Sequence, residues 1–195
     1  MDKIEAILNV NIVIAKGHQL SSIFAIRQEV YCSIGKLEAS RVQDSFDERA
    51  TQFLGGIGQN WVASARMVTD HSDFEMEKYF DLSHLRSRGK CAEINRFAIL
   101  PDYRGKAIAY AMFRGFYRYA MAQNIRYFCI VSVPGKNSEM YKQLGFSKLA
   151  DTVMYEELKQ PHDAYVLDLE AALDQWQVTR PRILEYFLKP IDGIG

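Results

Sequence analysis

The chain has 195 residues, of which 48% are hydrophobic and 25% charged, and its 24 basic and 24 acidic side chains give a formal net charge of zero. This composition is typical of a folded protein and excludes a disordered or fibrous one. Because the charges balance, the chain as a whole has no positive field that would favour nucleic acid, and no segment approaches the roughly 20 apolar residues of a membrane span.

Cysteine and histidine usage gives no sign of a metal site or of a disulfide framework. Cys32, Cys91 and Cys129 are odd in number, far apart and without metal-ligand spacing, and the four histidines form no metal or triad pattern. The N-terminal stretch lacks a small-residue cleavage site. We therefore expect a cytoplasmic protein with no metal.

The first half of the chain predicts a strand, a helix, a loop and a hairpin. Residues 10–15 are rich in β-branched side chains, and 20–33 carry apolar residues at helical spacing. The polar stretch 35–50 is aperiodic and indicates a loop. Residues 53–57 and 61–68 read as two strands around Gly58-Gln59-Asn60, a hairpin turn.

The second half predicts further alternation after an irregular, charged stretch at 70–90. The expected elements are a strand at 92–100, a helix at 104–123, a buried strand at 127–133, a short helix at 137–143, weaker strands at 153–158 and 165–168, and a C-terminal helical region. This order is that of an α/β protein with a mixed sheet, and the lack of a linker or repeat favours one domain over 1–195.

The densest chemical signal is Arg104-Gly105-Lys106-Ala107-Ile108-Ala109, which follows the strand at 92–100 and begins the long helix. Small residues at a helix start let backbone N–H groups and the helix dipole face an anion, so this turn can bind a phosphate. The alternative is an ordinary strand-to-helix turn, since short motifs also match by chance.

This turn resembles the pyrophosphate loop of the GNAT acyltransferases, and Tyr141-Lys142-Gln143-Leu144-Gly145-Phe146 resembles their short helix ending in Gly-Phe. The resemblance covers residues 8–168. It implies the GNAT fold, with a mixed sheet of about seven strands between helices, splayed between the fourth and fifth strands. It also implies that Phe97, Ala98 and Ile99 join the turn residues 104–109 in binding the acyl donor.

One position departs from the GNAT pattern: Ala107 stands where most of the family has glycine. The methyl group hinders a bulky diphosphate but leaves room for a donor with a single phosphate, such as the phosphopantetheine arm of a carrier protein. Basic side chains near the turn that such a carrier could contact are Lys106, Arg114, Arg118 and Lys136, although a solvated helix face is the commoner role of such residues.

A second set of charged and aromatic residues comprises, in chain order, Arg27, Tyr31, Asp44, Asp47, Arg66, Glu93 and Arg96. This set resembles that of the autoinducer synthases and their relatives, the long-chain N-acyl amino acid synthases such as FeeM. Leu37 or a neighbour falls where autoinducer synthases usually have tryptophan, which favours the amino-acid relatives. The resemblance implies transfer of a fatty acyl group from acyl carrier protein to an amino acid, tyrosine by analogy, with no permanently bound cofactor and with acyl-phosphopantetheine or acyl-CoA as co-substrate.

Acyl transfer to an amine requires a base, oxyanion donors and an acid for the leaving thiolate. Glu93 is our candidate base, the backbone N–H groups of Phe97–Ile99 are candidate oxyanion donors, and Tyr141 is either the acid or a packing residue. Arg66 or Arg96 could bind the carboxylate of an amino-acid acceptor.

Each charged residue also has a structural interpretation. Arg27, Asp44, Asp47 and Arg66 could form a salt-bridge network that pins the loop 35–50 to the sheet. Glu93 and Arg96 would face opposite sides of their strand unless a bulge intervenes between them.

Three other functions stay open on the sequence. They are an acyl-homoserine lactone synthase, an acetyl-CoA-dependent N-acetyltransferase, and a non-catalytic acyl-binding module, since a fold does not fix a function.

Overall fold

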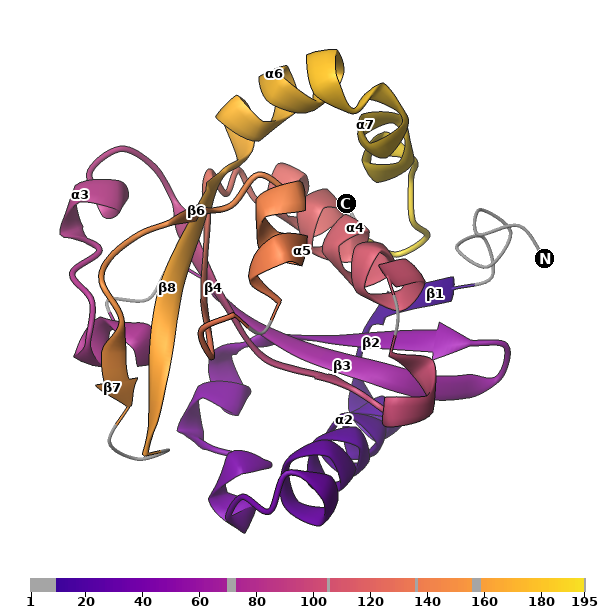
Figure 1. The fold of residues 1–195 in the computed structure, drawn as a ribbon. Coiled ribbons are helices and arrows are strands. Elements are labelled where there is room, and N and C mark those ends of the chain that lie inside the picture. Colours follow the sequence, from indigo (N-terminus) through magenta and orange to yellow (C-terminus); the bar gives the residue numbers. More distant parts are fainter. Residues whose placement is uncertain (1–9, 70–72, 105, 136, 156–158, 195) are drawn as a thin grey trace. The chain divides into compact units, whose positions relative to one another are not determined.

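The computed structural model of the chain describes residues 10–69, 73–104, 106–135, 137–155 and 159–194, without the side chains of Arg41 and Lys106. The strands are β1 Val10–Ile14, β2 Thr51–Ile57, β3 Asn60–Thr69, β4 Cys91–Ile99, β5 Tyr127–Ser132, β6 Ser147–Lys148, β7 Val153–Tyr155 and β8 Gln160–Asp168. The α-helices are α2 Leu20–Arg27, α3 Ser83–Arg86, α4 Lys106–Ala122, α5 Ser138–Gln143, α6 Leu169–Thr179 and α7 Pro181–Leu188 (Figure 1).

Shorter helical turns complete the chain. The 3-10 turns are η1 Gly17–Gln19, η3 Ala39–Arg41, η4 Ser45–Arg49, η5 Glu75–Lys78 and η6 Pro101–Tyr103, and α2 continues into the π-helical segment η2 Gln28–Ile34. The helix predicted at 20–33 is therefore present but widens in its second half. The loop predicted at 35–50 contains two of the 3-10 turns.

The eight strands follow the order β1-β2-β3-β4-β5-β8-β6, and β7 pairs with β8. The β4–β5 pair is parallel, whereas β1–β2, β2–β3, β5–β8, β6–β8 and β7–β8 are antiparallel. The mixed sheet expected from the sequence is confirmed. The strand that the sequence did not predict is β6, because its two residues are too few to show a periodic pattern.

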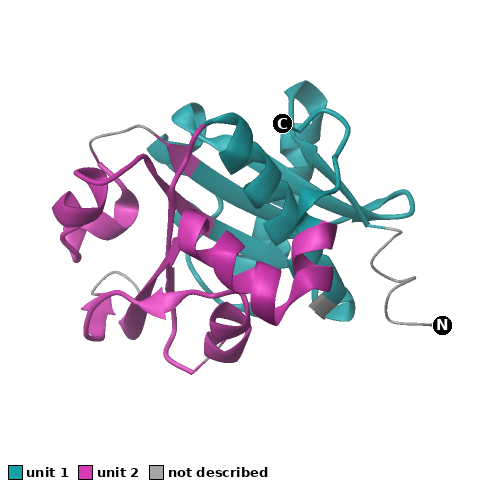
Figure 2. Cartoon of the chain, turned by 90° about the horizontal axis from the view of Figure 1, so that it is seen from above, with its two compact units in different colours: residues 1–67, 96–123, 187–195 teal, residues 68–95, 124–186 magenta. Residues whose placement is uncertain are grey.

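The chain divides into two compact units (Figure 2). Unit 1 comprises residues 1–67, 96–123 and 187–195, and unit 2 comprises 68–95 and 124–186. Each unit draws on separated segments of the chain, and strands β3 and β4 each contribute residues to both. The organisation as one domain stays a prediction.

In unit 1, helices α2 and α4 cover opposite faces of the first strands (Figure 1). Alternation along β2 explains this, because Leu54 packs with Ile23 of α2, whereas Phe53 packs edge to face on Phe116 of α4 with ring centroids 5.0 Å apart. Close approach of α4 depends on Gly115, where an added Cβ would lie 2.6 Å from Cγ2 of Ile12.

In unit 2, the parallel pairing of β4 with β5 is short. It joins Cys91–Glu93 to Tyr127–Cys129 and ends there, although β4 runs to Ile99 and β5 continues along β8 to Ser132. The splay expected between the fourth and fifth strands is thus confirmed. It begins at Glu93.

No helix in the described part of the chain is long and apolar enough to cross a membrane. The three cysteines are free thiols, and the described residues contain no group of His, Cys, Asp or Glu that could hold a metal ion.

Candidate active site

A buried network of charges in unit 1 joins the loop 35–50 to α2 and β2. The guanidinium of Arg27, which is fully buried, donates from Nη1 to Oδ1 of Asp47 (2.7 Å) and to the carbonyl of Val42 (3.1 Å). Its Nη2 donates to Oε1 of Gln52 (2.7 Å), whose own amide donates to the same Asp47 carboxylate (2.8 Å). Asp47 is therefore held from two elements at once.

Asp44 is the second carboxylate of this network and caps the short helix η4. Its Oδ1 accepts from the N–H of Phe46 (2.9 Å), and its own N–H donates to Oδ2 of Asp47 (2.9 Å), so the two aspartates cap each other's backbone. Asp44 also accepts from Nη1 of Arg66 and from Nη2 of Arg96 (2.6 Å). The Asp-x-x-Asp spacing thus sets both the turn and the ion pairs.

These contacts confirm the predicted salt-bridge network that pins the loop to the sheet. Burial alone would raise the pKa of Asp44 and of Asp47, but Arg66 and Arg96 beside Asp44, and Arg27 beside Asp47, lower each pKa below its usual value. Burial, only partly offset by Asp47, lowers the pKa of Arg27.

Gln52 is a member of the network that the sequence analysis missed. Its signal was a polar side chain in the otherwise apolar strand β2, where it is 4% exposed and lies opposite Arg66. A buried amide must find partners, and Gln52 finds them in Arg27 of α2 and in Asp47 of the loop.

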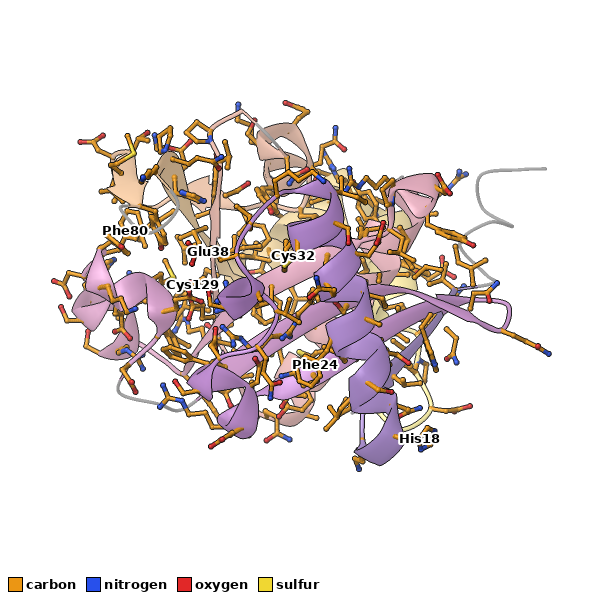
Figure 3. All side chains as sticks on the ribbon, turned by 90° about the horizontal axis from the view of Figure 1, so that it is seen from below. His18, Phe24, Cys32, Glu38, Phe80 and Cys129 are labelled. Atoms are coloured by element: carbon orange, nitrogen blue, oxygen red, sulfur yellow. The ribbon has the colours of Figure 1, made fainter. Side chains whose placement is uncertain are left out.

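The predicted site residue Tyr31 lies beside this network, in the π-helical segment η2. Tyr31 is half-buried and packs against the cluster around Ile23, Ile26 and Leu54, as does Phe24. Figure 3 labels Phe24 on α2. The guanidinium of Arg27 lies 5.7 Å from the centroid of the Phe24 ring. The Phe24 ring therefore lies against the buried arginine.

Arg96 interrupts the regular course of β4. Its φ is +50°, in the left-handed region that a residue with a side chain rarely adopts. A left-handed residue departs from regular strand geometry and is one feature of β-bulges, so it fits the bulge predicted between Glu93 and Arg96, which itself stays a prediction. The side chain of Arg96, 12% exposed, turns to Asp44.

The two residues after Arg96 pack in different parts of unit 1, one against α4 and the other in the cluster next to α2. Phe97 packs edge to face on Phe113 and Phe116 of α4, each at 5.9 Å, and Ala98 belongs to the buried cluster with Ile23 and Leu54. The carbonyl of Ile99 accepts from Nε of Arg104 (3.1 Å). The candidate oxyanion donors thus lie in a well-fixed stretch.

The phosphate turn is described in part, because Gly105 and the side chain of Lys106 lie outside the described residues. Arg104 is exposed at the end of η6, and α4 starts at Lys106. Ala107 is half-buried, whereas Ile108 and Ala109 are buried. The sequence correctly predicted a helix that starts within this turn.

In unit 2, Glu93 is 1% exposed and binds the start of the turn η5. Its Oε2 accepts from the N–H of Glu75 (2.7 Å) and its Oε1 from the N–H of Met76 (3.0 Å). Two of the roughly four acceptor positions of a carboxylate are used in this way. Glu93 lies at the last register position of the β4–β5 pair, opposite Cys129.

A second carboxylate on this turn escaped the sequence analysis. Glu75 is half-buried and its Oε2 accepts from the amide of Asn95 (3.3 Å), two residues beyond Glu93 on β4. Glu75 lies in the irregular stretch 70–90, where no periodicity marks one charged residue above another. Only the fold shows that it adjoins Glu93.

Tyr141, the candidate acid, is 3% exposed on α5. Its ring packs at 5.5 Å on Phe146 and at 5.3 Å on Tyr165 of β8. The packing that the sequence offered as the alternative to catalysis is therefore present.

The basic residues expected to meet a carrier protein have partners within unit 1. Arg114 donates to the carbonyls of Lys189 (3.3 Å) and Pro190 (2.6 Å), and Arg118 donates to that of Leu188 (3.2 Å). Both are half-buried, so they bind the C-terminal segment of the chain. Lys136, like the Lys106 side chain, lies outside the described residues.

Comparisons with solved structures support the fold. The structure of FeeM, an N-acyl amino acid synthase from uncultured soil microbes, superposes with a TM-score of 0.74 at 22% identity over 85% of this chain and 93% of that one. A putative N-acetyltransferase from Lactobacillus plantarum gives 0.64 at 14% identity, covering 82% of this chain and 98% of that one. The CoA-dependent acyl-homoserine lactone synthase BjaI gives 0.63 at 15% identity, with coverages of 91% and 86%.

Sequence comparison supplies the family. No curated protein matches the chain, but the model of the family described as N-acyl amino acid synthase FeeM matches residues 22–168. This range includes the whole charged network, Glu93 and the turn that opens α4. The chain therefore belongs to the FeeM family of N-acyl amino acid synthases and is an acyltransferase.

Proposed function

We propose that this protein transfers a long-chain fatty acyl group from the phosphopantetheine arm of acyl carrier protein to the α-amine of an amino acid, with tyrosine as the first acceptor to test. The family match over residues 22–168 carries this proposal. The finer choices of donor and acceptor rest on Ala107 in the phosphate turn and on the charged network of unit 1.

The chemistry follows from the residues available. A carboxylate takes a proton from the acceptor ammonium, and the neutral nitrogen attacks the thioester carbonyl carbon. The C–N bond forms as the carbonyl electrons move to oxygen, where backbone N–H groups of Phe97–Ile99 stabilise the oxyanion. As the carbonyl re-forms, the C–S bond breaks, the nitrogen loses its second proton and the thiolate takes up one. Glu93, held in place by two N–H groups, is the proposed base.

A carrier-borne donor is favoured over free CoA by Ala107, whose methyl group limits the room for a diphosphate. Incubation of the purified enzyme with tyrosine and either palmitoyl-acyl carrier protein or palmitoyl-CoA tests this directly. We expect N-palmitoyl tyrosine by mass spectrometry, formed faster from the carrier. A faster reaction with CoA would contradict the choice of donor while leaving acyl transfer intact.

The acceptor class is tested in the same assay. Amino acids offered singly should give N-acyl products, whereas S-adenosylmethionine should be neither consumed nor converted to a lactone. Lactone formation would support the homoserine-lactone reading, and acetyl transfer from acetyl-CoA would support an ordinary acetyltransferase. Absence of any product with every donor would favour a binding module.

Tyr141 is the proposed acid for the leaving thiolate. Replacement by phenylalanine keeps the ring contacts with Phe146 and Tyr165 but removes the hydroxyl, so we expect kcat to fall about 100-fold at nearly unchanged thermal stability. Tyr165→Phe is the matched control, since it removes a hydroxyl from the adjoining ring. Wild-type kcat in Tyr141→Phe would leave Tyr141 as a packing residue.

A further inference from the structure

The left-handed conformation of Arg96 is an unusual feature for the middle of a strand. A side chain at φ +50° crowds the backbone, so the conformation persists only where the surroundings enforce it. The chain pairs regularly before and after this residue, since Cys91–Glu93 pair with β5 and Leu100, just after β4, donates to the carbonyl of Val62 (2.9 Å) in β3. The departure is confined to one position.

The side chain of Arg96 ends on a carboxylate that is itself fixed. Oδ2 of Asp44 accepts from Nη2 of Arg96 (2.6 Å), and Oδ1 accepts from fully buried Arg66 and from the N–H of Phe46 (2.9 Å). The backbone of Asp44 is tied in turn to Asp47. Asp44 is thus a rigid anchor, and Arg96 is its link to β4.

Beyond Arg96, side-chain packing leaves little freedom. Phe97, which is half-buried, packs edge to face on two rings of α4, and Ala98 is 1% exposed in the core on the α2 side. With these two side chains fixed, the direction of the peptide between Arg96 and Phe97 depends on φ and ψ of Arg96. That peptide carries the first of the N–H groups assigned to the oxyanion.

We propose that the Asp44–Arg96 ion pair is a clamp that holds this left-handed residue and thereby aims the N–H group of Phe97 at the oxyanion. Arg96 is then a positioning residue and does not bind the acceptor carboxylate. The inference rests on the proposed function, because it concerns the same acyl transfer. In that step the nitrogen bonds to the carbonyl carbon and oxygen gains the electron pair. The oxyanion later expels the thiolate, while the nitrogen loses its second proton and the thiolate takes up one.

Glycine and alanine at position 96 separate the two roles. Both remove the guanidinium, but glycine adopts positive φ freely whereas alanine is strained there. For a clamp, Arg96→Ala should lower kcat about tenfold, and Arg96→Gly should recover most of that loss. The KM for the amino acid should stay within about twofold of wild type in both variants, since no acceptor contact is lost.

Lys36 provides a matched control. It also has positive φ (+58°) and lies in unit 1, but it is exposed and outside β4. Lys36→Ala and Lys36→Gly should differ in thermal stability in the same sense as the Arg96 pair, yet both should keep wild-type kcat. A difference in kcat between Lys36→Gly and Lys36→Ala would show that glycine at any position of positive φ changes kcat, and would contradict a specific role for Arg96.

Asp44→Asn completes the test as a double-mutant cycle with Arg96→Gly. If Asp44 acts through Arg96, the loss of kcat on Asp44→Asn should be several-fold smaller in the Arg96→Gly background than in the wild type. Should Arg96→Ala fail to fold, Arg96→Gln replaces it, because glutamine is equally strained at positive φ.

Equal kcat values in Arg96→Gly and Arg96→Ala would overturn the clamp. A rise of tenfold or more in the KM for the acceptor in both variants would also overturn it, because Arg96 would then bind the acceptor carboxylate. A wild-type enzyme that makes no N-acyl product contradicts the proposed function instead. Even then, urea unfolding reports on the clamp, since Arg96→Gly should be the more stable of the two variants.

Discussion

The two units hold their buried carboxylates in different ways. In unit 1, Asp44 and Asp47 pair with three arginines that come from α2, β3 and β4. In unit 2, Glu93 binds the backbone N–H groups of a single turn, η5. The first arrangement links elements that are distant in sequence, whereas the second fixes one short segment. Damage to the network should therefore weaken unit 1 broadly, and damage at Glu93 should act locally.

The strongest test of this difference is to remove Arg27. We expect Arg27→Met to lower the free energy of unfolding by about 3–5 kcal/mol, because it leaves Asp47 buried without its main cation. Urea unfolding followed by circular dichroism measures it. Arg49→Met is the control, since Arg49 is exposed and should cost less than about 1 kcal/mol. Equal losses in the two variants would contradict a special role for the network.

Glu93→Gln probes the other arrangement. The amide can accept from one of the two N–H groups but not from both, so we expect a loss of about 1–3 kcal/mol in the free energy of unfolding. If Glu93 is also the base, kcat should fall by about 10²–10⁴. A fall in kcat that is much larger than the loss in the free energy of unfolding would show that Glu93 takes part in the chemical step.

Glu75→Gln is the companion variant, because Glu75 is the second carboxylate of the turn and is bonded to Asn95. With Glu93 as the base, Glu75→Gln should keep kcat within about threefold of wild type. A loss of activity in Glu75→Gln at unchanged stability would move the proton transfer to Glu75 and leave Glu93 with the task of holding η5.

Acid should weaken the network of unit 1. The folded-state pKa of Asp44 and Asp47 is lowered, so each contributes stability that is complete above its unfolded pKa, near 3.8, and is lost as the pH falls through the lower folded value. We expect the free energy of unfolding to decline from about pH 5 downward, and Asp47→Asn to flatten that decline.

Asp81 serves as the control for this titration. Its pKa is also lowered, by the N–H and hydroxyl of Ser83, but its carboxylate is exposed. Asp81→Asn should therefore change the slope much less than Asp47→Asn. A larger effect of Asp81→Asn would mean that the buried network does not govern acid stability.

The sequence predicted the fold well because its signals are local. Strand and helix periods, Pro101 after β4 and the small residues before α4 each act over a few positions. It predicted the charged members of the unit 1 network by resemblance, and the spacing of Glu93 and Arg96 drew attention to the part of β4 where the backbone departs from regular geometry. It missed Gln52 and Glu75 because their importance depends on partners 25 and 18 residues away, which no local pattern shows.

The smallest expected effect belongs to the ion pair between Arg86 and Glu77 in unit 2. Its geometry is favourable: Nε and Nη2 of Arg86 donate to the two carboxylate oxygens at 2.8 and 2.6 Å, and the guanidinium lies 4.1 Å from the Phe74 ring centroid. The side chains are nevertheless 27% and 20% exposed, so water and salt reach both charges.

We therefore expect Arg86→Met to cost about 1 kcal/mol or less, and 1 M sodium chloride to reduce even that difference. Arg27→Met, measured beside it, should keep its larger cost in salt because its pair is dry. If Arg86→Met instead costs as much as Arg27→Met and resists salt, then two-point geometry rather than burial sets the strength of these pairs. In that case the contrast between the two units would lie in how many elements each pair joins.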